Sequence, residues 1–303
     1  MAIPYGSMTA DPLVRMRASL TGLSVGDAFG QCFLSPAVVE ECLADRKPPA
    51  GPWVWTDDTN MALSLVDVLS ESGSVDQDAL AVSFAKHFDA SRGYRGAMPD
   101  LLAEYAAGAD WRSVAPRLFE GSGSYGSGAA MRVAPLGAYF AHDLDQAVVE
   151  ATKQAEITHT HPEGVTGAIA VAVAAGIAAS GMTAPGSLVE SVIRRIPHSE
   201  VRDRLERTRR LRREASLASI ATLLGNDSGT TAQDTVPLAI WAAGLHLDNY
   251  PAALWLTAHA GGDVDTTCAM VGGIVGARVG IQGIPEEWLR RREPLPEWTR
   301  LHW

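Results

Sequence analysis

The sequence Gly261-Gly262-Asp263-Val264-Asp265-Thr266 places two carboxylates and a hydroxyl on a glycine hinge between two apolar segments. If the backbone is extended or turning there, the two aspartate side chains point the same way, and Thr266 adds a neutral oxygen donor. Oxygen donors of this kind suit hard cations such as magnesium, manganese or calcium. The same residues also make an ordinary helix N-terminus, with aspartate as the cap and negative charge favoured by the helix dipole. Both interpretations stay open on this stretch alone.

A second acidic sequence, Thr56-Asp57-Asp58-Thr59, precedes an apolar helical pattern that runs from Met61 to Leu69. Adjacent carboxylates repel each other, and unless they are solvated or neutralised by a cation, one of them binds a proton more readily. Gathering the four aspartates of both sequences would cost several kcal/mol without a countercharge. A pair of divalent cations would remove that penalty, with threonine hydroxyls completing the oxygen shell. A doubly acidic helix start is the alternative, but the shared design of the two sequences favours metal.

The composition is that of an ordinary soluble protein. Of the 303 residues, 47% are hydrophobic and 20% are charged, and the formal net charge is -10. A negative chain is not expected to bind nucleic-acid phosphates or anionic lipid by nonspecific attraction, so a small polar ligand or a protein substrate fits better. The three cysteines, Cys32, Cys42 and Cys268, form no Cys-x-x-Cys pair. They indicate neither a disulfide framework nor a thiolate zinc site, and they favour a reducing compartment.

The ends and the apolar runs predict a cytoplasmic protein that does not enter a membrane. The N-terminus lacks a basic segment followed by an apolar core and a cleavage site, so export is not expected. The most membrane-like run, Gly164 to Gly181, consists largely of alanine and glycine with some valine and isoleucine. A tightly packed buried helix is the preferred interpretation of this run, because it barely reaches spanning length and is weakly apolar.

The rest of the chain reads as helices separated by glycine- and proline-bearing breaks. The first helix is predicted from Asp11-Pro12 and is expected to end among the glycines of Gly26 to Gly30. Further helical patterns lie at 77–88, 98–107, 111–119, 144–157, 162–180, 185–195, 200–224, 231–245 and 250–259. Strand alternation and hairpin turns are scarce, and no long linker or repeat is visible. We therefore predict one compact all-α domain over residues 11–303, after a tail of residues 1–10.

Two further sequences carry possible chemistry. The loop Gly121 to Gly128 leads into a helical pattern and offers backbone N–H groups of the kind that cradle phosphates, although it matches neither the P-loop nor the Rossmann pattern. His159 and His161 stand before a proline, without cysteine or acidic partners at familiar zinc spacing. A histidine beside a phosphate or a ribose hydroxyl is the preferred interpretation. A helix-start histidine and a zinc ligand are the alternatives.

Taken together, five motifs resemble the ADP-ribosylglycohydrolase family, and their order and spread cover nearly the whole chain. They are Gly22-Leu23-Ser24-Val25-Gly26-Asp27-Ala28-Phe29-Gly30, Trp55-Thr56-Asp57-Asp58-Thr59, the stretch from Gly123 to Pro135, Thr158-His159-Thr160-His161-Pro162-Glu163-Gly164, and Gly261 to Thr266. The resemblance implies a compact, orthogonal multi-helix fold with two magnesium or manganese ions at the base of a cleft. It also implies cleavage of the N- or O-glycosidic bond between ADP-ribose and a modified protein side chain, nucleic acid or small molecule.

The resemblance assigns roles motif by motif. The implied metal ligands are Thr56, Asp57, Asp58, Asp263, Asp265 and Thr266. The implied catalytic residues are Asp57, Asp58 and Asp263. The implied contacts to ADP-ribose are Gly123, Ser124, Tyr125, Gly126, Ser127, Gly128, Met131 and His159. The expected partner is ADP-ribose or an ADP-ribosylated substrate, with nucleic acid only as the modified acceptor, and the chain is expected to be a monomer.

Two departures from the family pattern matter. Ser127 stands where many members have asparagine in the phosphate loop, and Leu34 stands near the position of a glutamate that many members carry. The missing glutamate leaves the proton donor unassigned and keeps a rival open, a non-catalytic relative that binds ADP-ribose. A helical phosphohydrolase with an aspartate-rich site is a third hypothesis, which the absence of the usual histidine–aspartate pairing disfavours.

Overall fold

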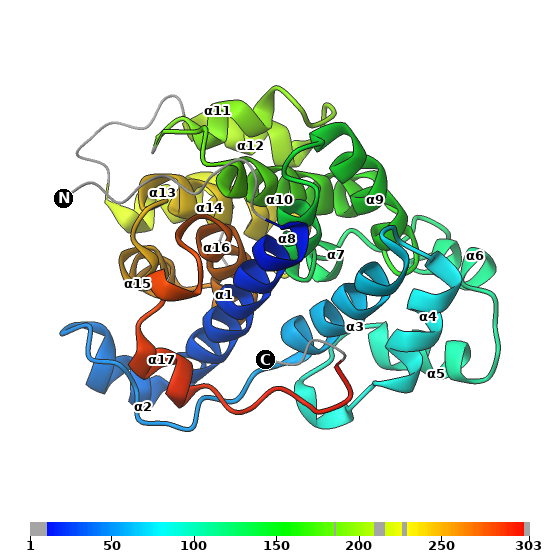
Figure 1. Ribbon diagram of the computed structural model, residues 1–303, viewed down its shortest axis with the longest axis horizontal. Coiled ribbons are helices and arrows are strands. Elements are labelled where there is room, and N and C mark those ends of the chain that lie inside the picture. Colours follow the sequence, from blue (N-terminus) through cyan, green and yellow to red (C-terminus); the bar gives the residue numbers. More distant parts are fainter. Residues whose placement is uncertain (1–10, 185, 209–215, 226–228, 300–303) are drawn as a thin grey trace.

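The computed structural model describes residues 11–184, 186–208, 216–225 and 229–299, and these residues form an all-helical protein (Figure 1). The first half contains α1 (Pro12–Cys32), α2 (Pro36–Val38), α3 (Asp57–Ser72), α4 (Gln77–Lys86), α5 (Met98–Ala106), α6 (Trp111–Val114), α7 (Gly128–Met131), α8 (Ala134–Tyr139) and α9 (Leu144–Glu156). The second half contains α10 (Pro162–Ser180), α11 (Leu188–Ile193), α12 (Glu200–Arg207), α13 (Leu217–Leu224), α14 (Ala232–Leu245), α15 (Tyr250–Ala260), α16 (Val264–Val279) and α17 (Glu286–Arg291). Short helical turns stand at Val39–Leu43, Ala90–Arg92, Ala115–Arg117 and Ile281–Gly283. The described residues contain isolated bridges but no strand, which confirms the all-α prediction.

Helices α1 and α16 lie side by side through the centre of the molecule (Figure 1). Gly22, Gly26 and Gly30 stand four residues apart on the face of α1 that meets α16. A Cβ built on Gly22 would lie 2.2 Å from the carbonyl oxygen of Gly272, and one on Gly26 would lie 2.2 Å from that of Cys268. The prediction that these glycines end the first helix was wrong. The helix continues to Cys32, because the glycines serve close backbone packing and do not terminate the helix.

Gly26→Ala should lower the free energy of unfolding by about 1–3 kcal/mol, because the added methyl group forces the two backbones apart. Urea denaturation followed by circular dichroism measures this change. Gly244→Ala in α14 is a matched control, since its Cβ would meet Leu188 at an ordinary 3.4 Å. The control should be neutral or stabilising by up to about 1 kcal/mol, as helix propensity predicts. Equal effects of the two substitutions would contradict the packing role of Gly26.

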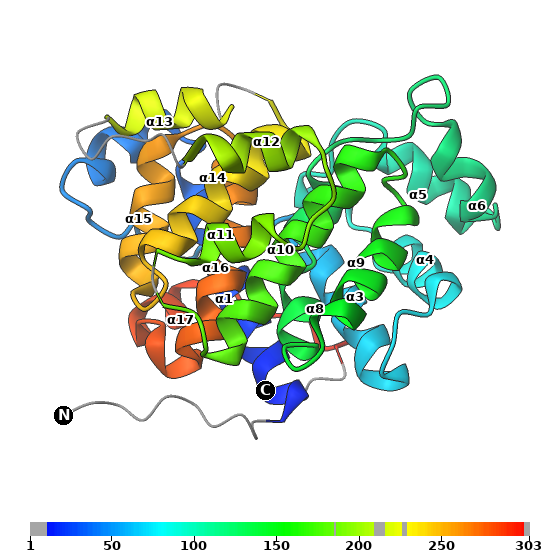
Figure 2. The same ribbon diagram turned by 90° about the horizontal axis from the view of Figure 1, so that it is seen from above.

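Helix α10 runs through the middle of the molecule, between α8 and α9 on one side and α14 and α16 on the other (Figure 2). Of the described helices it alone is long and apolar enough to cross a membrane, but 78% of its apolar window is buried inside the protein. A Cβ on Gly137 of α8 would lie 1.9 Å from the carbonyl oxygen of Ala172, so these two helices also touch backbone to backbone. The run from Gly164 to Gly181 is therefore a tightly packed core helix, as predicted.

Several predicted helix bounds were wrong. The single helix predicted over residues 200–224 is two helices, because Ser216 has an extended backbone and caps the N-terminus of α13 through the amide of Ser219. The pattern at 111–119 ends early, because α6 is followed by the 3-10 turn Ala115–Arg117 and Leu118 already has a non-helical backbone with ψ of 147°. The pattern at 185–195 narrows to α11, with Pro185 outside the described residues. The predicted tail, residues 1–10, also lies outside them.

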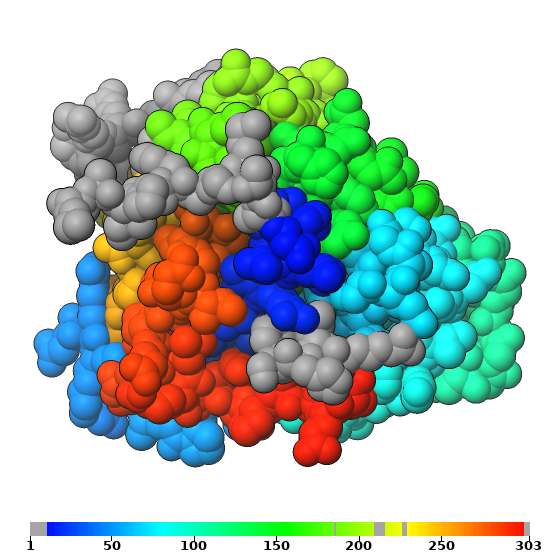
Figure 3. Space-filling view, in the orientation of Figure 1, coloured from blue at the N-terminus to red at the C-terminus, as the bar shows by residue number. Residues whose placement is uncertain are grey.

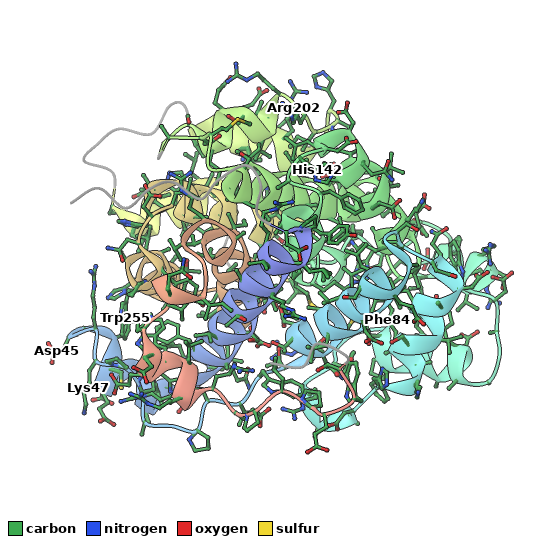
Figure 4. All side chains as sticks on the ribbon, viewed as in Figure 1. Asp45, Lys47, Phe84, His142, Arg202 and Trp255 are labelled. Atoms are coloured by element: carbon green, nitrogen blue, oxygen red, sulfur yellow. The ribbon has the colours of Figure 1, made fainter. Side chains whose placement is uncertain are left out.

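An aromatic cluster joins α1 to the C-terminal part of the chain. Phe29 stacks on Trp288 of α17 with ring centroids 4.6 Å apart, and it meets Trp255 of α15, labelled in Figure 4, edge-on at 5.0 Å. After α17, the described chain continues as an extended segment, residues 292–299, whose red atoms lie over the face of the molecule shown in Figure 3. Arg92 connects this segment to the rest of the protein, because it pairs with Glu293 and donates to the carbonyl oxygen of Trp55 at 3.0 Å.

Candidate active site

A cavity of about 300 Å³ lies where the N-termini of α3 and α16 meet the glycine loop before α7 and the loop before α5. Every site residue that the sequence predicts lines this cavity, with the exception of Thr56 and Gly123. Thr56 lies directly beneath it, because its hydroxyl contacts the lining residue Asp58 at 2.8 Å. Residues more than two hundred positions apart therefore share one cavity. Their individual roles remain predictions.

The acidic end of the cavity is formed by the first residues of two helices. Thr56 is the N-cap of α3, and its hydroxyl accepts a hydrogen bond from the amide of Asp58 at 3.3 Å. Asp263 occupies the N-cap position of α16, but its side chain makes no capping bond and instead lines the cavity beside Asp265. The helix-start interpretation is thus right for the backbone of both sequences. It does not explain the side chains of Asp263 and Asp265.

Asp27 supports this end from below and is the main residue that the sequence reasoning missed. It is fully buried on α1, and its carboxylate accepts four hydrogen bonds from α3 and its cap. The donors are the Thr56 amide at 2.9 Å, the Thr56 hydroxyl at 2.8 Å, the Thr59 amide at 3.1 Å and the Thr59 hydroxyl at 2.5 Å. Asp27 therefore fixes the start of α3 against α1. An aspartate inside an otherwise apolar, glycine-rich helix was the signal that could have revealed it.

Burial and mutual repulsion make these carboxylates hard to ionise. Burial is the main cause that raises the pKa of Asp27 and of Asp57 to about 7, and the charge of Asp265 adds to it in both. Burial also raises the pKa of Asp263 to about 7, again with the charge of Asp265 behind it. The pKa of Asp58 lies well above its ordinary value, through burial and then the charge of Asp27. Such clustering of raised carboxylate pKa values is typical of functional sites.

The donor set fits a hard cation. Asp58 and Asp265 each have a buried Oδ1 with no hydrogen-bond partner among the described residues. An unsatisfied buried carboxylate oxygen is costly, and a divalent cation is the usual means of satisfying it. Within the described parts of the chain, however, no three Asp, Glu, His or Cys side chains converge into a ready-made metal shell. The oxygens are of the right kind, and binding an ion requires them to draw together.

The glycine loop forms the opposite wall of the cavity. It is held by the segment before α14, since the Ser127 amide donates to the Thr230 carbonyl at 2.9 Å and the Ala232 amide donates to the Tyr125 carbonyl at 2.9 Å. The Gly126 amide donates to the Ser124 hydroxyl at 3.2 Å. Five amides of the loop, those of Gly121, Ser122, Gly123, Gly126 and Ser127, therefore donate within the protein, which the sequence could not show. Those of Tyr125 and Gly128 donate to no other described residue and remain for a ligand.

His159 lies at the back of this loop as a neutral hydrogen-bond donor. The Thr158 hydroxyl accepts from Arg132 at 3.0 Å and lies 2.7 Å from Nδ1 of His159. Because the hydroxyl proton has no other acceptor among the described residues, it points to Nδ1 and leaves the ring proton on Nε2. Burial, aided by the charge of Arg132, lowers the pKa of His159 to about 3. Arg132 itself stands over the ring of Phe84, labelled on α4 in Figure 4.

The two histidines have different surroundings: glycines lie beside His159, whereas His161 caps a helix. A Cβ on Gly126 would lie 3.3 Å from Nε2 of His159, and one on Gly128 would lie 2.8 Å from Cε1, so the glycines leave the histidine edge open to the cavity. His161 instead caps α10, where its Nδ1 accepts from the Glu163 amide at 3.1 Å. The helix-start interpretation thus describes His161, and His159 is the histidine that faces the ligand space. The two rings do not act as a zinc pair in this arrangement.

The remaining lining residues include some that no motif indicated. Phe119 is exposed at the rim beside the predicted Tyr125, with ring centroids 6.2 Å apart, and Thr230, Thr231 and Arg95 also line the walls. Their types are common on any surface, so only the fold brings them to the site. Leu34, near the position where many members of the resembled family carry a glutamate, is 39% exposed after α1 and does not line the cavity.

The fold and the cavity define an all-helical protein with an acidic, glycine-walled cleft. The sequence profile described as ADP-ribosylglycohydrolase matches residues 8–302. The chain is 26% identical to ADP-ribosylhydrolase ARH3 of Gallus gallus, over 97% of this chain and 93% of that protein. It is 27% identical to ADP-ribosylarginine hydrolase Tri1 of Pseudomonas putida (strain GB-1), over 92% of this chain and 74% of that protein. A solved ADP-ribosylglycohydrolase-related protein complex superposes with a TM-score of 0.68 at 26% identity, covering 93% of each chain. The chain belongs to the ADP-ribosylglycohydrolase family of enzymes.

Proposed function

We propose that this protein is a metal-dependent hydrolase that cleaves the N- or O-glycosidic bond between ADP-ribose and a modified acceptor. The observation that carries the proposal is the single cavity with two chemically distinct ends. One end gathers four aspartates at two helix N-termini, and the other offers glycine-loop amides and the Nε2 proton of His159. The first end suits cations and sugar hydroxyls, and the second suits a diphosphate.

Two magnesium or manganese ions are the cofactors that the acidic end would hold. Asp57, Asp58, Asp263 and Asp265 are the proposed ligands, with the hydroxyls of Thr56 and Thr266 completing the set. When bound, such ions neutralise the carboxylates, orient ribose hydroxyls and lower the pKa of a bound water. Asp27 would accept a hydrogen bond from the Thr56 hydroxyl, which would orient a lone pair of that hydroxyl oxygen toward the cavity. That hydroxyl has one proton, so it cannot donate to Asp27 and Asp58 at once.

The chain's own residues would accept the proton of the water and bind the diphosphate, the sugar and the adenine. An aspartate among Asp57, Asp58 and Asp263 would accept the proton of the attacking water. The free amides of Tyr125 and Gly128 and the Nε2 proton of His159 would bind the diphosphate, and Met131 would line the sugar. The rings of Phe119 and Tyr125 would pack against the adenine. Attack at C1 of the distal ribose proceeds through a transition state that resembles an oxocarbenium ion, so fixing this sugar is the main task of the cavity.

Release of ADP-ribose from defined substrates tests the proposal. The purified protein, incubated with magnesium or manganese, should release ADP-ribose from at least one member of a panel linked through arginine, serine, an acidic side chain or a nucleic-acid end. Chromatography of the product measures the rate. If every substrate stays intact while calorimetry shows tight ADP-ribose binding, the rival of a non-catalytic binder is correct. Cleavage of simple phosphoesters instead would favour the helical phosphohydrolase.

A further inference from the structure

Arg95 is the one permanently cationic side chain among the described residues that line the cavity. It lies at the acidic end, because its loop is joined to residues on both sides of the start of α3: Arg92 donates to the carbonyl oxygen of Trp55 at 3.0 Å, and the Tyr94 hydroxyl accepts from Nδ2 of Asn60 at 3.1 Å. Arg95 therefore faces the place where the bond to the acceptor breaks, not the place proposed for the diphosphate.

The loop that carries Arg95 is firmly anchored. On one side of it, the Arg92 guanidinium lies 3.2 Å from the centroid of the Trp55 ring and pairs with Glu293. Tyr94, the neighbour of Arg95, accepts a hydrogen bond from Nδ2 of Asn60 at 3.1 Å. Arg95 itself is exposed, and its side chain makes no hydrogen bond or ion pair with another described residue. A fixed backbone thus presents an unpaired positive charge to the cavity.

Among the described residues that line the cavity, none is a spare acid that could protonate a leaving group. Its lining carboxylates are Asp57, Asp58, Asp263 and Asp265, which are the proposed metal ligands. A carboxylate that holds a divalent cation is ionised, so it can accept a proton but not donate one. Leu34 supplies no replacement, since it lies outside the cavity. The leaving group must then depart as a weakly basic anion, and a nearby cation would stabilise that anion.

We propose that the preferred acceptor is joined to C1 of the distal ribose through an acidic oxygen, that of a phosphate or a carboxylate, and that Arg95 selects it. This inference rests on the proposed function. The oxygen of water forms a bond to C1, and the bond from C1 to the acceptor oxygen breaks. The electron pair stays on the phosphate or carboxylate, which leaves as an anion, and the proton of the water passes to an aspartate. A cationic guanidinium acceptor would be repelled by Arg95.

Four substrates with the same ADP-ribose test this selectivity: ADP-ribose carrying a phosphate on C1, and peptides linked through glutamate, serine or arginine. The wild type with magnesium should show a kcat/KM at least about tenfold higher on one or both acidic linkages than on arginine. Arg95→Ala should reduce that preference by roughly 10- to 100-fold, and Arg95→Lys should retain most of it. The phosphate and glutamate arms show which source of the acidic oxygen is used.

A control variant and a second measurement separate selectivity by Arg95 from a general effect on activity. Arg117→Ala removes an exposed arginine that does not line the cavity, and it should leave the preference unchanged. Calorimetry gives a second readout: wild type should bind C1-phosphorylated ADP-ribose more tightly than ADP-ribose, and Arg95→Ala should lose that difference. An equal loss on all four substrates would assign Arg95 to the diphosphate and overturn the inference, as would a wild-type preference for arginine. Turnover of none of the four would instead refute the proposed function.

Discussion

Asp57→Ala and Asp265→Ala should each reduce ADP-ribose release by roughly 1,000-fold or more, because each removes one proposed ligand from a cluster that acts as a unit. Asp57 starts α3 and Asp265 lies in the first turn of α16, so the two substitutions remove carboxylates that two separate helices contribute to the acidic end. Steady-state kinetics with saturating magnesium or manganese measures the loss. Calorimetric titration with manganese should show at least one binding event missing from each variant.

A general loss of structure has to be separated from loss of the site. Asp145→Ala removes an exposed carboxylate from the first turn of α9, far from the cavity lining, and should keep wild-type rates and metal binding. Circular dichroism should show the same helix content in all three variants. Full manganese binding in Asp57→Ala together with lost activity would mean that Asp57 acts on the substrate and not on the metal. Full activity in both variants would remove the acidic cluster from the mechanism.

Helix content and core positions follow from periodicity, so they were predictable. The apolar run in α10 and the capped start of α3 carry local signals that survive in the fold. The predicted end of the first helix was wrong because a glycine there serves a tertiary purpose. Gly26 resembles a helix terminator in sequence, yet its backbone is needed against Cys268, a contact that no local pattern encodes.

The candidate site likewise contains residues that the sequence singles out and residues that it does not. Asp57, Asp263 and the glycine loop have unusual residue types in unusual clusters, so the sequence singles them out and the fold brings them to one cavity. Asp27 is a single aspartate whose importance lies in four hydrogen bonds to α3 and its cap. Arg95 is a single surface arginine whose importance lies in what it faces. Arg95 therefore has no signature in one sequence, and only the packing of distant elements reveals it, whereas Asp27 leaves the weak signal of an aspartate inside an apolar helix.

Metal-free protein should be less stable at about pH 8 than at about pH 5, and divalent cations should reverse that loss. The pKa of Asp27, Asp57 and Asp263 is raised by burial to about 7, from an ordinary value of 3.8. A carboxyl whose pKa is higher in the folded protein than in the unfolded chain stabilises the fold below the unfolded pKa. That contribution is lost as the pH rises through the folded pKa. One such carboxyl corresponds to roughly 2.5 kcal/mol between pH 5 and pH 8, before any relaxation of the cluster.

Thermal melts of the EDTA-treated protein should therefore show a midpoint lower by about 5–10 °C at the higher pH. Asp57→Asn removes one ionisable group from the cluster, so its advantage over the wild type should grow as the pH rises. Manganese should raise the wild-type midpoint strongly at about pH 8 and weakly at about pH 5, because protons compete with the ion for the same oxygens. A metal-free midpoint that is equal at both pH values in wild type and Asp57→Asn would show that these carboxylates are solvated and carry no repulsion. The four aspartates would then lack the penalty that makes a cation their natural partner.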